Sequence, residues 1–152
     1  MPAVLLLSFG GYLKITRQPQ EGLPENAVTV TNAAGTSVQF SVEMAVTPDE
    51  REKGLMFRPT LAAKTGMAFI FPRPEIVDFW MKNTIVPLDM IFVRRDGMIA
   101  SIARDRVPFS LAGTFSGSPV TAVLEMPAGT AARFDLARGD RVSGLGSHLP
   151  PM

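Results

Sequence analysis

The chain is 152 residues long, which is enough for one domain with one hydrophobic core. A hydrophobic content of 46% and a charged content of 19% are typical of a folded protein and exclude a disordered one. The net charge of +1 gives no electrostatic footprint for nucleic acid, so we expect no nucleic-acid partner. The absence of cysteine excludes disulfides, thiolate nucleophiles and zinc–cysteine sites.

The first 26 residues are predicted to be separate from the folded domain. Residues 3–13 form an apolar run that is too short to span a bilayer, so we expect no integral membrane segment. The run has the length of a signal-peptide core, but no basic residue precedes it. An export signal and an ordinary first strand are both open, with export slightly favoured. Residues 16–26 are polar with Pro and Gly, which predicts a linker.

The folded body is predicted over residues 27–143 and begins with β-structure. Residues 28–31 and 38–46 alternate apolar and polar side chains with a period of two, which predicts half-buried strands. Residues 32–36 supply a turn between them. Glu43 lies on the polar face of the second strand, where we expect it to be solvated.

A short helix is predicted to follow the second strand. Thr47 is a good N-cap, Pro48 suits the first helical position, and Glu50 completes a capping box. The helix should end by Arg58 because a proline follows that residue. Arg51 and Arg58 would lie about 10 Å apart on one face and could bind an anion, although two solvated arginines are the commoner outcome.

The middle of the chain is predicted to hold the core strands. Residues 66–71 are continuously apolar, which indicates a strand buried on both faces, and residues 72–75 read as a loop. Residues 79–84 and 88–93 are predicted as strands on either side of Pro87.

The remaining elements follow a strong hairpin turn at Asp96-Gly97. They are a strand over residues 98–102, a strand over 120–126, a short helix capped by Thr130 and running to Ala137, and a last strand at 141–142. Residues 144–152 are predicted to be a flexible tail. About seven strands and two short helices predict a mainly β, single-domain β-sandwich or small barrel.

The most unusual stretch is the segment Phe79–Thr84, which contains the only tryptophan of the chain. Lys82, Asp89 and Glu125 are charges in apolar strands, which is costly unless they are paired or used, so we expect the three to meet in space. We expect the helix to pack beside this strand and leave a polar-walled groove. Seven side chains are the candidate ligand-binding residues: Arg51, Arg58, Trp80, Lys82, Asn83, Asp89 and Glu125.

Several chemistries are not expected. The only histidine, His148, lies in the tail, which argues against Ser–His–Asp catalysis and histidine-based metal sites. Carboxylates are not clustered as a calcium or magnesium site requires. We therefore assign no metal, no cofactor and no catalytic residue, and whether the protein is an enzyme is open.

Three functions are open beside a purely structural charge network. The first is a non-catalytic binding domain for a small polar or anionic ligand or a glycan, in a groove near Trp80. The second is a carboxylate-based hydrolase or lyase that uses Asp89 and Glu125. The third is a peptide- or protein-interaction module that uses an exposed sheet edge.

Five motifs resemble, in order, the signatures of a bacterial and archaeal family known as domain of unknown function 192. They are residues 43–48 with Arg51, Gly54-Leu55-Met56 and Arg58; Gly66-Met67 with Phe69 and Phe71; Phe79 to Thr84; Pro87-Leu88-Asp89 with Ile91-Phe92; and Val123-Leu124-Glu125 with Ala128-Gly129. The resemblance covers roughly residues 38 to 142. It implies a β-rich single domain that is often exported in bacteria, and it implies no activity.

Overall fold

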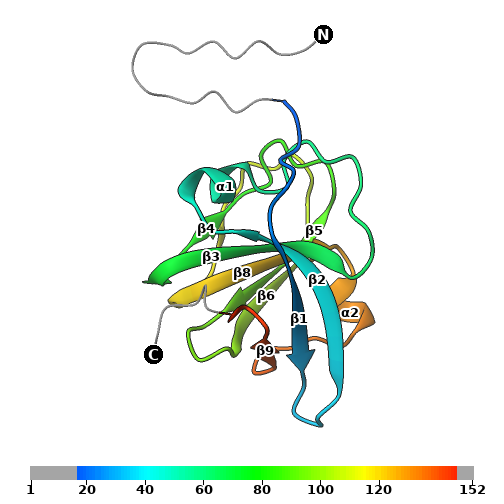
Figure 1. The fold of residues 1–152 in the computed structure, drawn as a ribbon, viewed down its shortest axis with the longest axis vertical. Helices are drawn as coiled ribbons and strands as arrows, with labels where there is room; N and C mark the ends of the chain where they lie inside the picture. The colour runs from blue at the N-terminus through cyan, green and yellow to red at the C-terminus, as the bar shows by residue number, and fades with distance from the viewer. Residues whose placement is uncertain (1–16, 147–152) are drawn as a thin grey trace.

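The computed structural model describes residues 17–146, and a curled sheet makes up most of this part of the chain (Figure 1). Its elements are β1 (Glu25–Thr31), β2 (Ser37–Ala45), α1 (Pro48–Lys53), β3 (Thr65–Glu75), β4 (Asp78–Phe79), β5 (Leu88–Val93), β6 (Ile99–Arg106), β7 (Thr114–Phe115), β8 (Val120–Pro127), α2 (Thr130–Arg133) and β9 (Arg141–Ser143). The mainly β fold with two short helices is confirmed.

Seven strands form the large sheet in the order β6-β5-β8-β3-β2-β1-β9, and β4 and β7 form a separate two-stranded ribbon. All neighbours pair antiparallel except β2 and β3, which are parallel and are joined through α1. A parallel pair needs a crossover connection, and the segment with α1 supplies it. That crossover places α1 over one face of the sheet.

The sheet curls until its two ends meet. The amide of Ile99, where β6 begins, donates a hydrogen bond to the carbonyl of Asp140 at 2.9 Å, and the amide of Val142 in β9 donates to the carbonyl of Gly97 at 2.7 Å. These bonds pair backbone groups that the two edge strands would otherwise expose. The result is closer to a small barrel than to a sandwich.

The two faces of the curled sheet bury separate cores. The concave core is made by Val28, Val30, Phe40, Val42, Met44, Ala68, Ile70, Ile91, Val93, Ile99, Leu124 and their neighbours. The outer core is made by Ala45, Leu55, Met67, Phe69, Phe71, Val77, Met81, Leu88, Met90, Phe92, Val120 and Val123. Side chains alternate between the two faces along each strand, so both cores draw on β3, β5 and β8.

Two local predictions are confirmed at the level of single hydrogen bonds. The amide of Glu50 donates to Thr47 Oγ1 at 3.2 Å, and Glu50 Oε1 accepts from the amide of Thr47 at 3.1 Å, which is the predicted capping box. At the predicted hairpin turn, the amide of Arg94 donates to the carbonyl of Met98 at 2.9 Å. Both features depend on residues close in sequence.

The prediction of a strand over residues 79–84 is wrong beyond Phe79. After β4 the chain turns, because the amide of Thr84 donates to the carbonyl of Met81 at 3.1 Å and Asn83 adopts a positive φ of 54°. A second bond runs from the amide of Met81 to the carbonyl of Ser110 at 2.9 Å, so a distant loop fixes this segment. The side chains of residues 80–84 therefore do not alternate between two faces of a strand.

Helix α1 ends at Lys53, before the predicted limit at Arg58. Two other elements differ from the prediction. Residues 72–75 continue β3 although they include two prolines, and the pairing register with β8 is broken between Ile70 and Glu75, the kind of irregular position where prolines are tolerated. Helix α2 ends at Arg133, and Gly129, not Thr130, is its N-cap.

Segments on both sides of the predicted body pack on it. Gln20 Nε2 donates to the carbonyls of Glu50 and Gly54 at 2.9 and 3.1 Å, and the carbonyl of Pro24 accepts from the amide of Met44 at 2.8 Å. Leu145 is buried in the concave core. Residues 17–24 are thus not a free linker, and the start of the predicted tail is ordered by packing.

Two predictions fall on parts of the chain that the structure does not describe. The apolar run at residues 3–13 and His148 lie outside residues 17–146. Among the described helices, none is long and apolar enough to cross a membrane.

Candidate functional site

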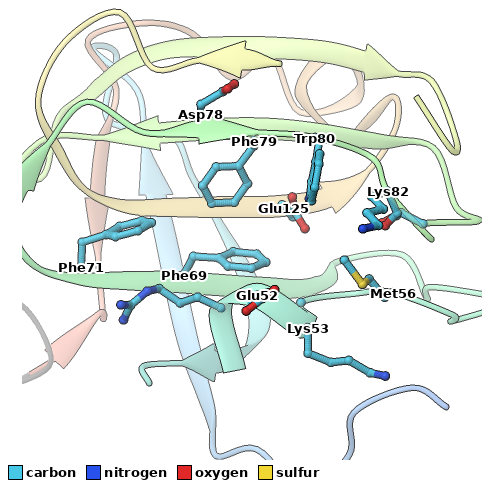
Figure 2. A pocket seen from close by; sticks show the side chains of 13 residues that line it. Glu52, Lys53, Met56, Phe69, Phe71, Asp78, Phe79, Trp80, Lys82 and Glu125 are labelled. Atoms are coloured by element: carbon cyan, nitrogen blue, oxygen red, sulfur yellow. The ribbon is translucent and has the colours of Figure 1, made fainter. Parts of the chain in front are cut away.

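A pocket of about 240 Å³ opens on the outer face of the sheet, between α1 and the segment that follows β4 (Figure 2). We name it the Trp80–Glu125 pocket. It is lined by Arg51, Glu52, Lys53, Gly54, Met56, Phe69, Phe71, Asp78, Phe79, Trp80, Lys82, Thr84 and Glu125. The pocket lies beside α1 as expected, but its other side is β4 and the loop after it rather than a strand over residues 79–84, and aromatic side chains line much of it.

Aromatic side chains form the apolar wall of the pocket. Phe69 and Phe71 come from β3, and Phe79 from β4 packs edge-on against both, with ring centroids 5.0 and 6.3 Å away. Phe79 also meets Phe92 of β5 at 6.4 Å. Such edge-to-face contacts fix ring orientations, so this wall is rigid.

Gly54 lets the end of α1 approach the aromatic wall. A Cβ at this position would lie 3.1 Å from Cε1 and Cζ of the Phe69 ring. The residue also adopts a positive φ of 49°, which L side chains rarely accept. Glycine is therefore required here for both backbone shape and close packing.

Glu125 forms the floor of the pocket from the middle of β8. It lies between Met67 of β3 and Met90 of β5 in the sheet register, and only 5% of it is exposed. Its carboxyl group has no hydrogen bond or ion pair with any residue that the structure describes. Burial raises the pKa of Glu125 to about 8, since desolvation penalises the charged form. At neutral pH this group is mostly protonated and can both donate and accept a hydrogen bond.

Trp80 and Lys82 stand together at the mouth of the pocket. Lys82 Nζ lies 4.9 Å from the Trp80 ring centroid, within cation–π range. Trp80 is 47% exposed, so its indole is half open to solvent. Figure 2 shows Glu125 directly beneath Trp80, with the Lys82 ammonium beside it.

Arg51 lines the pocket but is already engaged. Its Nη1 donates to the carbonyl of Ile70 at 2.9 Å and to that of Val46, and its guanidinium lies 5.1 Å from the Phe71 ring centroid. These contacts fasten α1 to β3. Arg51 therefore serves mainly to hold α1 in place.

Arg58 and Asn83, two predicted site residues, lie outside the pocket. Arg58 forms a two-pronged ion pair with Glu43, and its Nη2 also donates to the carbonyl of Gln20 at 2.9 Å. The expectation that Glu43 is solvated is therefore wrong, because the pair is only 17% exposed on each side. The Asn83 carbonyl accepts from the amide of Phe57 at 2.8 Å, which ties the loop to the end of α1.

Asp89 lies on the opposite face of the sheet from Glu125. It pairs with Met126 in the register, one residue beyond the Glu125 position, so its side chain points the other way. Its two carboxylate oxygens accept hydrogen bonds from the amides of Asp105 and Ala131, both at 2.9 Å. The expected meeting of Lys82, Asp89 and Glu125 is not formed, and neither is a two-carboxylate site.

Four of the predicted site residues line the pocket: Arg51, Trp80, Lys82 and Glu125. The aromatic wall is not predicted, because Phe69 and Phe71 lie in a stretch whose sequence indicates only a buried strand. A buried strand shows no alternation, so the sequence gives no sign of which ring faces a pocket. Within residues 17–146, no group of three or more potential metal ligands is present.

The fold and the pocket together define a class of protein: a small curled-sheet β domain with an aromatic pocket and one buried acid on its outer face. The chain belongs to the family described as Uncharacterized ACR, domain of unknown function 192, whose model matches residues 29–144. The family resemblance inferred from the five motifs is thus confirmed.

The solved structures that are similar to this chain include the following two. One, from Sinorhizobium meliloti 1021, is described as a proposed transcription regulator; it is 42% identical with a TM-score of 0.81, over 84% of this chain and 98% of that one. The other is a protein of unknown function from Novosphingobium aromaticivorans DSM 12444, 41% identical with a TM-score of 0.78, over 83% of this chain and 89% of that one. No curated protein matches this chain.

Proposed function

We propose that this protein is a non-catalytic binding domain that holds a small polar ligand in the Trp80–Glu125 pocket. One observation carries the proposal: the Glu125 carboxyl is buried, points into an open pocket and has no partner among the described residues. A buried polar group without a partner costs free energy, which a ligand could recover. Glu125 is then a binding group kept unpaired for that ligand.

The shape and chemistry of the pocket support the proposal. Ligand sites are typically concave and largely apolar, with a few polar groups that fix the orientation of the ligand. Here the rings of Phe69, Phe71 and Phe79 form the apolar wall, Glu125 supplies a polar contact at the floor, and Lys82 lies at the mouth. The volume of about 240 Å³ suits a ligand smaller than a nucleotide.

Two alternatives have less support. A hydrolase or lyase with paired Asp89 and Glu125 would need both carboxyl groups in one cleft, whereas the sheet separates them. The description of the Sinorhizobium meliloti protein as a proposed transcription regulator suggests DNA as a partner. The net charge of +1 does not favour that partner, because DNA binding depends on neutralised phosphates.

A ligand panel tests the proposal. We expect one class among sugars, organic acids, amines, nucleotides and peptidoglycan fragments to raise the melting temperature and change the fluorescence of Trp80. Trp80 is the only tryptophan of the chain, so its emission reports on this pocket directly. Ligands stabilise the state they bind, which gives the melting shift its meaning.

A pair of variants makes the panel specific. Glu125→Gln should remove the ligand-induced shift, whereas Lys64→Met should keep it. Lys64 is a suitable control because it lies outside this pocket. Its ammonium group lies 5.3 Å from the Phe134 ring centroid, which is the same type of contact that Lys82 makes with Trp80. Equal shifts in the two variants would contradict the proposal.

A further inference from the structure

We infer that the ligand of the Trp80–Glu125 pocket is a small organic cation, with an ammonium or guanidinium group bound against Glu125 and the aromatic rings. This inference rests on the proposed function and gives its ligand a chemical class. It replaces the expectation of an anion, which required Arg51 and Arg58 to face the same site.

The charged groups of the pocket favour a cation. Those that line it are Arg51, Glu52, Lys53, Asp78, Lys82 and Glu125. Arg51 is engaged with two backbone carbonyls and with Phe71, and Lys53 lies 4.7 Å from the Phe57 ring. By contrast, the carboxyl groups of Glu52, Asp78 and Glu125 form no hydrogen bond or ion pair with a described residue. In Figure 2 the Asp78 carboxyl group points away from Glu125.

The aromatic side chains favour a cation as well. An ammonium or guanidinium over a ring face is attracted by the negative face of the π system. The structure already shows this attraction at both ends of the pocket, where Lys82 lies over Trp80 and Arg51 lies over Phe71. Lys82 is exposed and has no carboxylate partner among the described residues, so a ligand cation can displace it from Trp80 at little cost.

A cationic ligand also changes the protonation of Glu125, because it stabilises the ionised carboxylate. A protonated acid beneath an aromatic wall attracts a cation weakly, whereas the ionised acid in the same low-dielectric site attracts it strongly. Binding therefore couples to release of the Glu125 proton to solvent. Lys82 lines the same pocket and opposes the incoming charge, so its removal should reduce that repulsion without changing Glu125.

Three probes with the same four-carbon chain separate the charge classes: n-butylammonium, 1-butanol and butyrate. Affinities are measured by Trp80 fluorescence and calorimetry, at pH 7 and pH 9, in two buffers of different ionisation enthalpy. We expect n-butylammonium to bind at least about tenfold tighter than the other two probes, as one good charge-assisted contact allows. Its affinity should rise about tenfold from pH 7 to pH 9, with close to one proton released at pH 7, because the ionised fraction of Glu125 rises by that factor.

Two variants test the assignment of the groups. Glu125→Gln should reduce the affinity for n-butylammonium to that for 1-butanol and remove its pH dependence. Lys82→Met should strengthen n-butylammonium binding, since it removes a like charge, while Lys64→Met leaves it unchanged. Because Lys82 is exposed, its variant stays informative even if Glu125→Gln proves difficult to fold.

Three outcomes would contradict the inference of a cationic ligand, and each has a different consequence for the proposed function. If butyrate binds best and Lys82→Met abolishes its binding, the ligand is an anion and this inference is wrong. If 1-butanol binds as well as n-butylammonium with no pH dependence, the pocket binds ligands but not by charge, and only the proposed function survives. If no probe and no member of the ligand panel binds, both the proposed function and the inference fail.

Discussion

Two buried acids in this domain meet the cost of burial in opposite ways. Asp89 is fully buried and receives hydrogen bonds from two backbone amides, one of them in the first turn of α2. Glu125 is nearly as buried but receives none from the described residues, and its pKa rises to about 8. A carboxylate with two charge-assisted hydrogen bonds contributes to stability, whereas a carboxyl kept without partners is typical of a binding site. The two residues therefore predict different results on substitution.

Glu125→Gln should alter how stability depends on pH. The folded pKa of about 8 lies above the ordinary value of 4.5, so the folded state favours the protonated acid. The wild-type domain therefore loses stability as pH rises from about 4.5 toward 8, by roughly 3–4 kcal/mol between pH 5 and pH 8. The variant cannot ionise at this position and should lack that loss. Chemical denaturation at pH 5, 6.5 and 8 checks this, and parallel curves for the two proteins would contradict it.

Asp89→Ala should destabilise the domain without affecting the pocket. The substitution leaves the buried amides of Asp105 and Ala131 without acceptors, which costs about 2–4 kcal/mol in the free energy of unfolding. Since Asp89 lies on the other face of the sheet, the response of Trp80 to ligands should persist at temperatures where the variant is folded. Loss of that response in a folded Asp89→Ala variant would revive the two-carboxylate hypothesis.

At the scale of elements, α1 is short and depends on contacts at its ends. Its capping box fixes the start, Arg51 ties it to β3, and Gly54 brings its end onto Phe69. A helix of six residues gains little stability by itself, so these attachments decide its position. The position of α1 in turn sets one wall of the pocket.

Gly54→Ala should destabilise the domain more than Gly35→Ala does. Both glycines adopt a positive φ, which alone costs an alanine about 1–2 kcal/mol, but an added methyl group at Gly35 meets nothing within 4 Å. At position 54 the ψ of −133° lies outside the left-handed helical region and the methyl group presses on the Phe69 ring, so backbone strain and packing together should raise the cost to about 2–4 kcal/mol. Thermal denaturation of both variants measures the difference. Equal losses would mean that the approach of α1 to Phe69 carries no packing constraint.

For the molecule as a whole, one curled sheet separates two cores and leaves the outer one to be covered by non-sheet segments. The cover comes from the segment after α1 with Leu55 and Leu61, from Val77 and Phe79 at β4, and from the loop after β4 with Met81 and Val86. The segment before β1 adds to this cover, because Gln20 bonds to the end of α1 and Leu23 packs against the outer core. The pocket exists because this cover is incomplete above Glu125.

Truncation tests the role of the segment before β1. A chain that begins at residue 25 should melt several degrees lower than one that begins at residue 17, because it lacks the hydrogen bonds of Gln20 and the backbone bond of Pro24 to Met44. Gln20→Ala in the longer chain should reproduce part of the loss. Equal melting temperatures would support the prediction from sequence that the first 26 residues are separate from the folded domain.

Sequence alone determined the features that depend on near neighbours. The alternation in β1 and β2, the capping box at Thr47 and Glu50 and the Asp96-Gly97 turn each rest on a few consecutive residues, and all were predicted correctly. Trp80, Lys82 and Glu125 were singled out because a charge or a lone indole within an apolar stretch is conspicuous. Export of the protein, which rests on residues 3–13, stays a prediction.

Only the tertiary structure decided which of those side chains share a site. The strand predicted over residues 79–84 is a loop because the carbonyl of Ser110, distant in sequence, binds the amide of Met81. Asp89 and Glu125 look alike as charges in apolar strands, and only the pairing of β5 with β8 places them on opposite faces. Strand pairing joins residues of unrelated sequence position, and a shift of one residue reverses every side chain, so a single sequence cannot settle it.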